Sequence, residues 1–456
     1  MSAMSAMPTE SSSPPLPWCI IGAGPSGLTA LKNLLACGIA AEALEREQVL
    51  GGNWAFGTET SRVFASTRLI SSKSLTAFTD FPMPREWPAY PDHRQCLDYL
   101  HRYADHFGLQ QHIRFNARVA ALEPQLDHGG RRRGWAVHLA DGSTRHYAGL
   151  VLASGHNHVP RWPEIPGQFS GPCIHAAEYK SPTVPRPLAA QRVLVIGGGN
   201  SGCDIAVEVS REAAATFHST RRSYHVVPRM VFGRPADLRG ERLLKMGAPL
   251  WLRRLVSQRA IARTIGLPER HGLPLPDHRL WETHPVINDS LYAQIDAGAL
   301  TPVPDVRRFD GDVVEFSDGR REPVDVVIAA SGYHLTLPGI APALLNSHAG
   351  LPRLFLHLLH PTASDLAVVG MIQPDSGQWG LTDLQAHVVA RMILAERAAP
   401  RARAWLARQR RRQPVLSPIR YLDSPRHALE VEHFRYAQHL RRLISGLDRR
   451  LRQAQG

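Results

Sequence analysis

The fold is decided by residues 18–27, WCIIGAGPSG, in which a short apolar run leads into a glycine-rich turn. Residues 28–37 follow with the composition of a helix. In such a strand–turn–helix the first glycine permits the tight turn, the second lets a pyrophosphate approach the backbone, and the third lets the helix pack on the strand. The pyrophosphate then lies at the helix N-terminus, where unpaired N–H groups point at it. The residues predicted to bind it are Gly22, Gly24, Pro25, Ser26 and Gly27.

The same pattern occurs again at residues 193–202, VLVIGGGNSG, and helix-like residues 203–210 follow it. Two copies in this context predict an α/β protein with two Rossmann-like dinucleotide-binding domains, and therefore two bound dinucleotides. The predicted binding residues of the second turn are Gly197, Gly199, Asn200, Ser201 and Gly202.

The residue that closes the second strand of each unit distinguishes the two nucleotides. Glu45 ends the segment AEALE, and a carboxylate there can accept hydrogen bonds from both hydroxyls of an unphosphorylated ribose, as in FAD. The matching segment of the second unit has no acid and ends in Arg221 and Arg222. A guanidinium binds the 2′-phosphate that a carboxylate would repel, so this site is predicted to prefer NADPH. The alternative is that these arginines are exposed charges at a strand end.

The domain layout follows from the positions of the two motifs. Two Asp-Gly pairs, Asp141–Gly142 and Asp318–Gly319, predict hairpins. An apolar run at 324–333 is expected to return the chain to the first domain. We therefore predict a disordered tail at 1–16, an FAD domain made of 17–184 and 323–456, and an NADPH domain inserted at 185–322. Residues 230–285 form a variable lobe of the inserted domain, whose elements the pattern does not assign.

Length and composition exclude several other classes. A chain of 456 residues suggests two or three domains. The net charge of +13 lies partly in 401–412 and 449–452, which are expected to be solvated helix faces, and no nucleic-acid motif accompanies them. A weak attraction to anionic lipid or an acidic partner stays open. No apolar run approaches the roughly 20 residues of a membrane span.

The cysteine and histidine patterns give no metal or disulfide site. Five cysteines without a C-x-x-C pair fit a reducing cytoplasm, and they lack the dithiol of a flavin disulfide reductase. The pairs His156 with His158 and His357 with His360 have no nearby acidic or cysteine partners, so no metal is predicted.

Residues 169–180, FSGPCIHAAEYK, resemble the F-x-G-x-x-x-H-x-x-x-[YW] fingerprint of the flavin-containing monooxygenases and their Baeyer–Villiger relatives. His175 in this segment is either catalytic or a packing residue of the interdomain link. The resemblance continues in GGNW at 51–54, in ASGY at 330–333, and near the C-terminus. It implies that Arg46, Asn53, Trp54, Val119 and Gln373 contact FAD, and that Ser201, Gly202 and Asp204 contact NADPH.

The resemblance implies a flavin hydroperoxide that transfers one oxygen atom of O2 to a soft nucleophile: an amine or hydroxylamine nitrogen, a thioether sulfur, or indole. Ile70 occupies a position where many members place an asparagine, and Ser71 is a candidate substitute near the flavin. The alternatives are Baeyer–Villiger oxygenation of a ketone, with Arg68 as a candidate cation, and an NADPH oxidase or sensor without oxygen transfer. The small-molecule pocket is expected where the domains meet, with the 230–285 lobe as a lid. A homodimer is left open.

Overall fold

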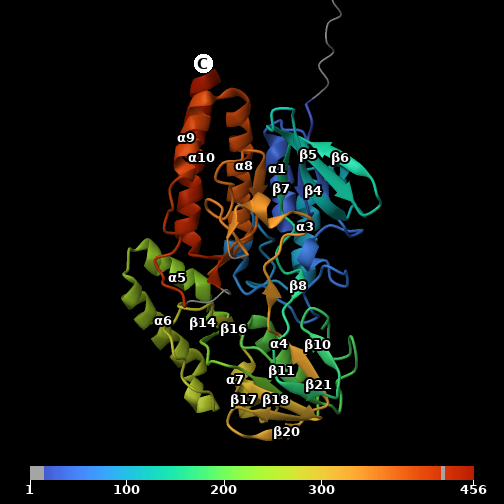
Figure 1. Cartoon of the computed structure of the whole chain (residues 1–456). Helices are drawn as coiled ribbons and strands as arrows, with labels where there is room; N and C mark the ends of the chain where they lie inside the picture. The colour runs from blue at the N-terminus through green and yellow to red at the C-terminus, as the bar shows by residue number, and fades with distance from the viewer. Residues whose placement is uncertain (1–14, 349, 423–426, 456) are drawn as a thin grey trace, which may run out of the picture.

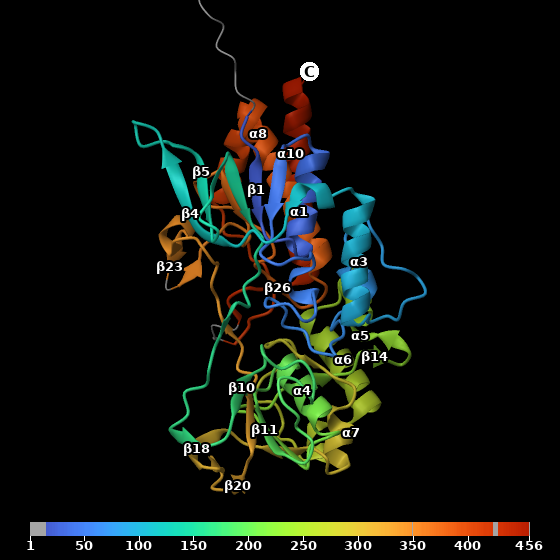
Figure 2. The same cartoon turned by 90° about the vertical axis from the view of Figure 1, so that its right-hand side faces the viewer.

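The computed structural model describes residues 15–348, 350–422 and 427–455. The chain forms two lobes, one above the other in Figure 1. The upper lobe contains both ends of the chain, coloured blue and red, and the lower lobe contains its middle, coloured green and yellow (Figures 1 and 2). The tail predicted at 1–16 lies outside the described residues, apart from residues 15 and 16.

A five-stranded parallel sheet forms the centre of the upper lobe, in the order β25-β7-β1-β2-β3. Strands β1 and β7 are buried along their whole length, as expected of parallel strands covered on both faces. Because β25 comes from the C-terminal part of the chain, both ends of the chain contribute strands to this sheet. The strands are β1 (Trp18–Ile21), β2 (Ala41–Leu44), β3 (Ile113–Arg114), β7 (Gly149–Leu152) and β25 (Leu366–Val368).

Helices and a small antiparallel sheet cover the parallel sheet. Helix α1 (Pro25–Ala36) packs on α8 (Trp379–Ala398), which packs on α10 (His433–Gln455). Helix α3 (His93–His106) begins with a capping box. The predicted hairpin at Asp141–Gly142 joins two strands of the small sheet, which consists of β4 (Val119–Leu126), β5 (Arg132–Leu139) and β6 (Thr144–Tyr147).

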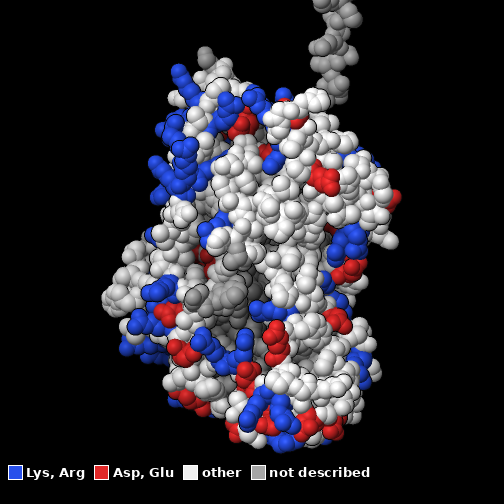
Figure 3. Space-filling view, in the orientation of Figure 1, with Lys and Arg blue, Asp and Glu red and all other residues white. Residues whose placement is uncertain are grey.

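The C-terminal arginines lie on α10 and on α9 (Pro400–Arg410). Arg401, Arg403 and Arg408 are exposed, and Figure 3 shows basic side chains gathered over these helices. Arg410 differs because it is buried and donates a hydrogen bond to the Ala363 carbonyl oxygen at 3.1 Å. Most of the run is therefore a solvated face, as the sequence predicts.

A second five-stranded parallel sheet forms the centre of the lower lobe, in the order β10-β21-β11-β12-β17. Helix α4 (Asn200–Val209) follows β11 through the second glycine turn. The predicted hairpin at Asp318–Gly319 joins β19 (Val313–Phe316) to β20 (Arg321–Pro323). The sheet strands are β10 (Cys173–His175), β11 (Arg192–Ile196), β12 (Ala215–Ser219), β17 (Thr301–Val303) and β21 (Val326–Ala329).

The boundaries predicted for the inserted domain, 185 and 322, are wrong because they cut through this sheet. Strand β10 precedes residue 185, and β21 follows residue 322, yet the two pair with each other in parallel. The run containing β21 was expected in the first domain. A fully buried strand has the same apolar sequence in either parallel sheet, so periodicity could not assign it. The chain returns to the upper lobe after β21, where β22 (Tyr333–His334) pairs with β8 (Val159–Pro160).

The 230–285 segment contains two helices, α5 (Ala236–Lys245) and α6 (Leu250–Ile265). They lie below the C-terminal helices, on the left side of Figure 1. The remaining short elements are η1 (Gly52–Trp54), α2 (Lys73–Thr76), η2 (Gln110–His112), β9 (Gly167–Phe169), β13 (Val226–Val227), β14 (Met230–Val231), β15 (Arg234–Pro235), η3 (Pro268–His271), β16 (Val286–Ile287), α7 (Leu291–Asp296), β18 (Val306–Gly311), η4 (Pro342–Leu345), β23 (Ser347–His348), β24 (Leu351–Pro352), β26 (Gln373–Pro374) and β27 (Glu430–Val431).

Candidate active site

The first glycine turn has the close backbone contacts that its motif requires. Gly22 has a φ of +103°, and a Cβ on Gly27 would lie 1.8 Å from the Gly22 carbonyl oxygen. Only glycine therefore lets α1 approach β1 this closely. Gly24 is the N-cap of α1, where no side chain caps the helix, and Pro25 is its first residue. The free N–H groups of this turn fit a pyrophosphate.

Two further glycines, Gly52 and Gly370, pack closely against the first turn. A Cβ on Gly52 would lie 3.0 Å from the Cα of Gly24, so the GGNW segment packs directly on the turn. A Cβ on Gly370 would lie 2.1 Å from the hydroxyl of Ser26, which places the loop after β25 beside the start of α1. The three segments that the resemblance assigns to FAD thus meet in one place.

Glu45 follows β2 directly and is 4% exposed. Its two carboxylate oxygens accept hydrogen bonds from the N–H of Ala23 at 2.7 Å and of Glu47 at 3.0 Å. Burial raises the pKa of Glu45, and these hydrogen bonds oppose the rise. The carboxylate is therefore fixed beside the glycine turn, while its contact with a ribose stays a prediction. The Nε of Arg46 is buried without a hydrogen bond and lies 3.6 Å from the Glu47 carboxylate in an ion pair.

The other residues assigned to FAD have partners within the protein. The side-chain oxygen of Asn53 accepts a hydrogen bond from the Arg62 N–H at 2.7 Å. Trp54 packs edge-on against Trp379, with ring centroids 5.6 Å apart. Val119 begins β4 and is partly buried, and Gln373 donates a hydrogen bond to Glu430 at 2.9 Å. Their contacts with flavin or adenine stay predictions.

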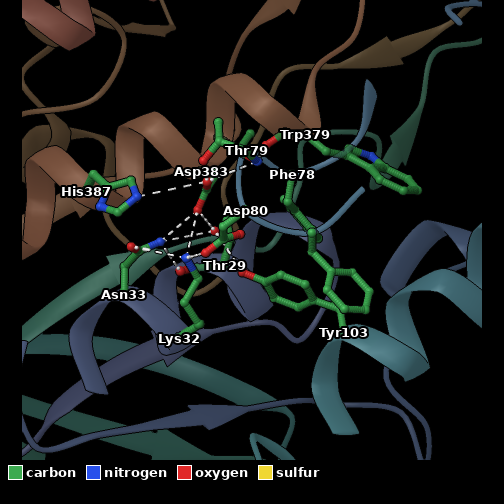
Figure 4. Close-up of polar contacts among 12 residues, drawn as sticks. Thr29, Lys32, Asn33, Phe78, Thr79, Asp80, Tyr103, Trp379, Asp383 and His387 are labelled. Carbon is green, nitrogen blue, oxygen red and sulfur yellow. Dashed lines mark hydrogen bonds and ion pairs between the residues drawn. The ribbon is translucent and has the colours of Figure 1, made fainter. Parts of the chain in front are cut away.

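A buried polar network joins α1 to α8 close to the first glycine turn (Figure 4). Asp383 on α8 is fully buried and accepts hydrogen bonds from Thr29 at 2.5 Å and Asn33 at 2.8 Å, and from Thr79. The Lys32 ammonium lies 3.3 Å from the same carboxylate. Burial alone would raise the pKa of Asp383, but Lys32 and the hydrogen bonds outweigh it and hold the pKa below its ordinary value. The network fixes the glycine-bearing helix to the C-terminal part of the domain.

The second glycine turn repeats the geometry of the first. Gly197 has a φ of +135°, and a Cβ on Gly202 would lie 2.0 Å from the Gly197 carbonyl oxygen. Gly199 is the N-cap of α4 without a side-chain cap, and Ser201 in the first turn of that helix is exposed. This turn therefore also offers free N–H groups and fits a second pyrophosphate.

Asn200 and Asp204 position a neighbouring segment of the chain. Asn200 accepts a hydrogen bond from the Ile287 N–H at 2.7 Å and donates one to the Pro285 carbonyl oxygen at 3.3 Å. Asp204 accepts one from Asn288 at 2.6 Å, and burial raises the pKa of Asp204 to about 6. The two side chains hold residues 285–288 against α4, and their contact with NADPH stays a prediction.

Arg221 and Arg222 follow β12 at the same edge of the sheet at which α4 begins. Arg222 forms an ion pair with Asp277, with a nitrogen–oxygen distance of 3.4 Å. Arg221 is exposed, and its guanidinium has no hydrogen-bond or ion-pair partner in the described parts of the chain. Arg221 is thus the arginine whose donors are available to a ligand.

His175 of the fingerprint is a packing residue. It is fully buried in β10, its ring lies between Trp162 and Tyr333, and its Nδ1 accepts a hydrogen bond from the Ala177 N–H at 3.1 Å. The centroid distances are 5.5 and 5.4 Å, respectively. The ring therefore fills the interdomain link, which favours the structural alternative.

A cavity of about 160 Å³ lies between the two domains, as the sequence predicts. Ile70, Ser71 and Tyr90 contribute to it from the first domain. Residues 374–376, Glu432 and Phe434 contribute from the C-terminal part. The 230–285 lobe forms the largest part of the wall, with Val231, Leu243, Val256, Ala260, Ile261 and Trp281 among its lining residues.

The positions predicted to lie near the flavin reach this cavity, and the candidate cation does not. Ile70 is 36% exposed and lines the wall. The Ser71 hydroxyl also lines it, 2.8 Å from the Thr76 hydroxyl. Arg68 is exposed and is not among the lining residues. No cation from this segment therefore faces the cavity.

Two hydrogen bonds fasten the lobe to the first domain beside Ile70. The Asp237 carboxylate at the start of α5 accepts one from the Ser72 N–H at 2.7 Å. The Tyr90 hydroxyl donates one to the Arg229 carbonyl oxygen at 2.7 Å. The lobe thus closes the cavity over the segment at 70–72.

Sequence reasoning missed the charged residues of the cavity wall, among them Arg253, Asp375 and Glu432. They come from three separate parts of the chain, and no motif contains them. Their charge within otherwise apolar segments is the signal that could have identified them.

Several negative observations concern only the described residues. Among residues 15–348, 350–422 and 427–455, no group of three or more histidine, cysteine, aspartate or glutamate side chains could hold a metal ion. The five cysteines are not disulfide-bonded. No helix within the described ranges is long and apolar enough to cross a membrane.

Comparison with known proteins identifies the family of the chain. The family model FMO-like, described as flavin-binding monooxygenase-like, matches residues 18–448. Flavin-containing monooxygenase 5 of Mus musculus is 30% identical over 444 residues, which cover 91% of this chain and 80% of the relative. The structure of S-allyl-L-cysteine S-oxygenase from Allium sativum has a TM-score of 0.63 at 20% identity, and the match covers 94% of this chain and 88% of that one.

OTEMO, solved in complex with FAD and NADP, gives a TM-score of 0.63 at 19% identity over 84% of each chain. At these identities the two solved structures support the fold with two Rossmann-type domains. The family match extends over nearly the whole chain and includes both glycine turns, the fingerprint and the C-terminal elements. The chain therefore belongs to the flavin-binding monooxygenase-like family and is a flavin-dependent monooxygenase.

Proposed function

We propose that this enzyme uses NADPH, FAD and O2 to oxygenate a soft nucleophile bound in the cavity beside Ile70 and Ser71. One oxygen atom goes to an amine or hydroxylamine nitrogen, a thioether sulfur or indole, and the other leaves as water, with two electrons supplied by NADPH. A flavin hydroperoxide, the intermediate expected from the sequence, is part of the proposal. The observation that carries it is the cavity between the two nucleotide domains.

The wall of the cavity supports this chemistry because it partly shields the site from water. Its lining includes aliphatic side chains beside the charged ones, and the bonds of Asp237 and Tyr90 fasten the lobe over the flavin-side segment. A dry site protects a reactive oxygen donor from wasteful protonation and leaves it for a nucleophile. The protein's contribution is thus to bind, orient and desolvate, while bound FAD supplies the oxygen chemistry.

NADPH is supported by Arg221, and O2 and a small-molecule substrate are supported by the size and position of the cavity. OTEMO binds FAD and NADP in its solved complex, which agrees with two dinucleotides on this fold. A cytoplasmic location, inferred from the cysteine pattern, is part of the proposal.

Rapid mixing tests the proposal. The enzyme is first reduced with NADPH without oxygen and then mixed with O2, and the flavin spectrum is followed. We expect a long-lived oxygenated flavin whose decay accelerates when a substrate is added. Direct return to oxidised FAD with one equivalent of H2O2 would support the oxidase alternative and overturn the proposal.

A substrate panel of amines, thioethers, indole and ketones, scored by oxygenated product, tests the class of nucleophile. We expect product from nitrogen or sulfur compounds. Formation of esters from ketones alone would instead establish Baeyer–Villiger oxygenation.

A further inference from the structure

The cavity contains a buried guanidinium without a partner. Arg253 on α6 lines the cavity and is 7% exposed. Its Nε is buried without a hydrogen bond, and the side chain forms no ion pair or hydrogen bond with any part of the chain that the structure describes. Its one strong contact is with the ring of Trp281, whose centroid lies 5.5 Å from the guanidinium carbon. Such a stack leaves the donors at the edge of the guanidinium available.

The neighbouring Arg254 differs from Arg253 in having partners within the chain. Arg254, the next residue, donates to the Leu280 carbonyl oxygen at 3.0 Å and pairs with Glu282 at 3.3 Å. The buried Arg410 also has a carbonyl partner. A buried cation without an acceptor is costly, so an anion that completes its hydrogen bonds is strongly favoured.

The carboxylates of the cavity wall do not supply that anion. Asp237 accepts hydrogen bonds from the N–H groups of Ser72 and Leu238. Glu432 accepts from two N–H groups at the start of α10, and Asp375 accepts from another. Glu241, the remaining lining carboxylate, also interacts with another residue. None of these four carboxylates therefore pairs with Arg253, and its donors are available to a ligand in the cavity.

A second arginine repeats the arrangement. Arg239 on α5 also lines the cavity, has a buried Nε without a hydrogen bond, and lies over Phe232 at 4.9 Å. Phe232 and Trp281 have φ values of +47° and +71°, a conformation that bulky residues rarely adopt. Backbone strain of this kind is retained where the surroundings enforce it, often at ligand sites. Both residues place an aromatic ring over a guanidinium that lines the cavity.

We propose that Arg253, with Arg239 beside the same cavity, binds a carboxylate of the substrate. The inference rests on the proposed function and narrows its substrate class to amines or thioethers that carry a carboxylic acid. A planar carboxylate matches the fork of a guanidinium with two parallel hydrogen bonds. Arg253 then fixes the orientation of the substrate, and its Ala or Met variants lose specificity without losing the flavin.

The test compares 3-(methylthio)propanoate with its methyl ester, which carry the same sulfur and differ in charge. Wild type is compared with Arg253→Met and with Arg259→Met, an exposed arginine of the same helix that does not line the cavity. We expect Arg253→Met to lower kcat/KM for the acid about ten- to hundredfold, the range for a hydrogen bond to a charged group. Its kcat/KM for the ester, its KM for NADPH and its FAD content should stay unchanged, and Arg259→Met should match wild type throughout.

Thermal unfolding supplies a second readout. Because Arg253 is buried without a hydrogen-bond or ion-pair partner, Arg253→Met should melt at or above the temperature of wild type in the absence of substrate. The acid should raise the melting temperature of wild type and leave that of Arg253→Met unchanged. A large loss of stability in the variant would show that Arg253 has a structural role and overturn the inference.

Binding without turnover separates this inference from the proposed function. The acid is titrated into the oxidised enzyme without NADPH, and the perturbation of the flavin absorbance is recorded. Binding of the acid by wild type and not by Arg253→Met supports the inference even if no sulfoxide forms, in which case only the proposed function fails. Equal binding of acid and ester by wild type overturns the inference, as does a rise in KM for NADPH that leaves the acid unaffected.

Discussion

Replacing Arg221 by alanine should impair the use of NADPH and leave the use of NADH unchanged. Arg221 follows β12, which ends at Ser219, at the edge of the second sheet where the glycine turn and α4 also lie. The nucleotide of a Rossmann fold binds along this edge. The guanidinium of Arg221 is exposed and has no partner among the described residues, whereas that of Arg222 is paired with Asp277. Arg221 is therefore the first contact expected for a 2′-phosphate.

The size of the effect follows from this exposure. A hydrogen bond to a charged group contributes about 1.5–3 kcal/mol, and the lower end applies to an exposed group screened by salt. About 1.4 kcal/mol corresponds to a factor of ten, so kcat/KM for NADPH should fall roughly tenfold. Arg222→Ala is the matched control, and its effect should stay within about twofold because its guanidinium is already occupied.

The assay is the rate of flavin reduction measured without oxygen over a range of NADPH and NADH concentrations. Reduction isolates the coenzyme step from oxygen transfer, so the result does not depend on the substrate. The preference of wild type for NADPH should also shrink as ionic strength rises, since the contact is screened. A loss of equal size for NADPH and NADH in Arg221→Ala would refute the reasoning, because it would show that Arg221 does not contact the 2′-phosphate.

Three further predictions concern stability and coupling. Asp383→Ala should lower the free energy of unfolding by about 3 kcal/mol, as measured by thermal melting. This is the low end for a broken buried ion pair, because Lys32 retains its ion pair with Asp80. A change below about 1 kcal/mol would contradict a stabilising role of the network. Asp237→Ala should raise the fraction of NADPH oxidised to H2O2, and unchanged coupling would show that its bond does not close the cavity. Burial raises the pKa of Asp375 from its ordinary 3.8 to about 7, so its contribution to stability is present below pH 3.8 and lost as the pH rises through 7. Asp375→Asn should therefore raise the melting temperature more at pH 8 than at pH 5, and equal shifts would count against the raised pKa.

The fold could be predicted largely because its decisive signals are local. Each glycine turn directly follows a strand that is present as expected, β1 at 18–21 and β11 at 192–196. Both hairpins follow from Asp-Gly pairs. The domain boundaries failed because sheet membership is not local: β10 and β21 are separated by most of the inserted domain, yet they are neighbours. Nothing in four apolar residues tells which sheet will bury them.

The candidate site, like the fold, could be predicted from the sequence only in part. The positions of Glu45 and Arg221 could be predicted because each follows the second strand of its own unit. The residues of the cavity wall could not be predicted. Helices α5 and α6 contribute cationic side chains to a cavity that forms only when three distant segments of the chain meet. Arg253 interrupts the apolar pattern of α6 for this reason. A helix that borders a charged cavity lacks a regular amphipathic pattern of apolar residues. The sequence pattern therefore does not assign the helices of the 230–285 lobe.

Ile70 raises the question of what protects an oxygenated flavin in this enzyme if an asparagine amide does not. The nearest hydroxyl, that of Ser71, is already hydrogen-bonded to Thr76, so it is a poor replacement donor. Ile70 instead adds aliphatic surface to the wall at the point where the lobe is fastened through Asp237. Since water supplies the protons that release H2O2, the aliphatic surface of Ile70 and the fastened lobe would protect the proposed intermediate by shielding it, where an amide would protect it by hydrogen bonding. Coupling should then depend on the fastening of the lobe more than on any polar group beside the flavin, which is the quantity that Asp237→Ala measures.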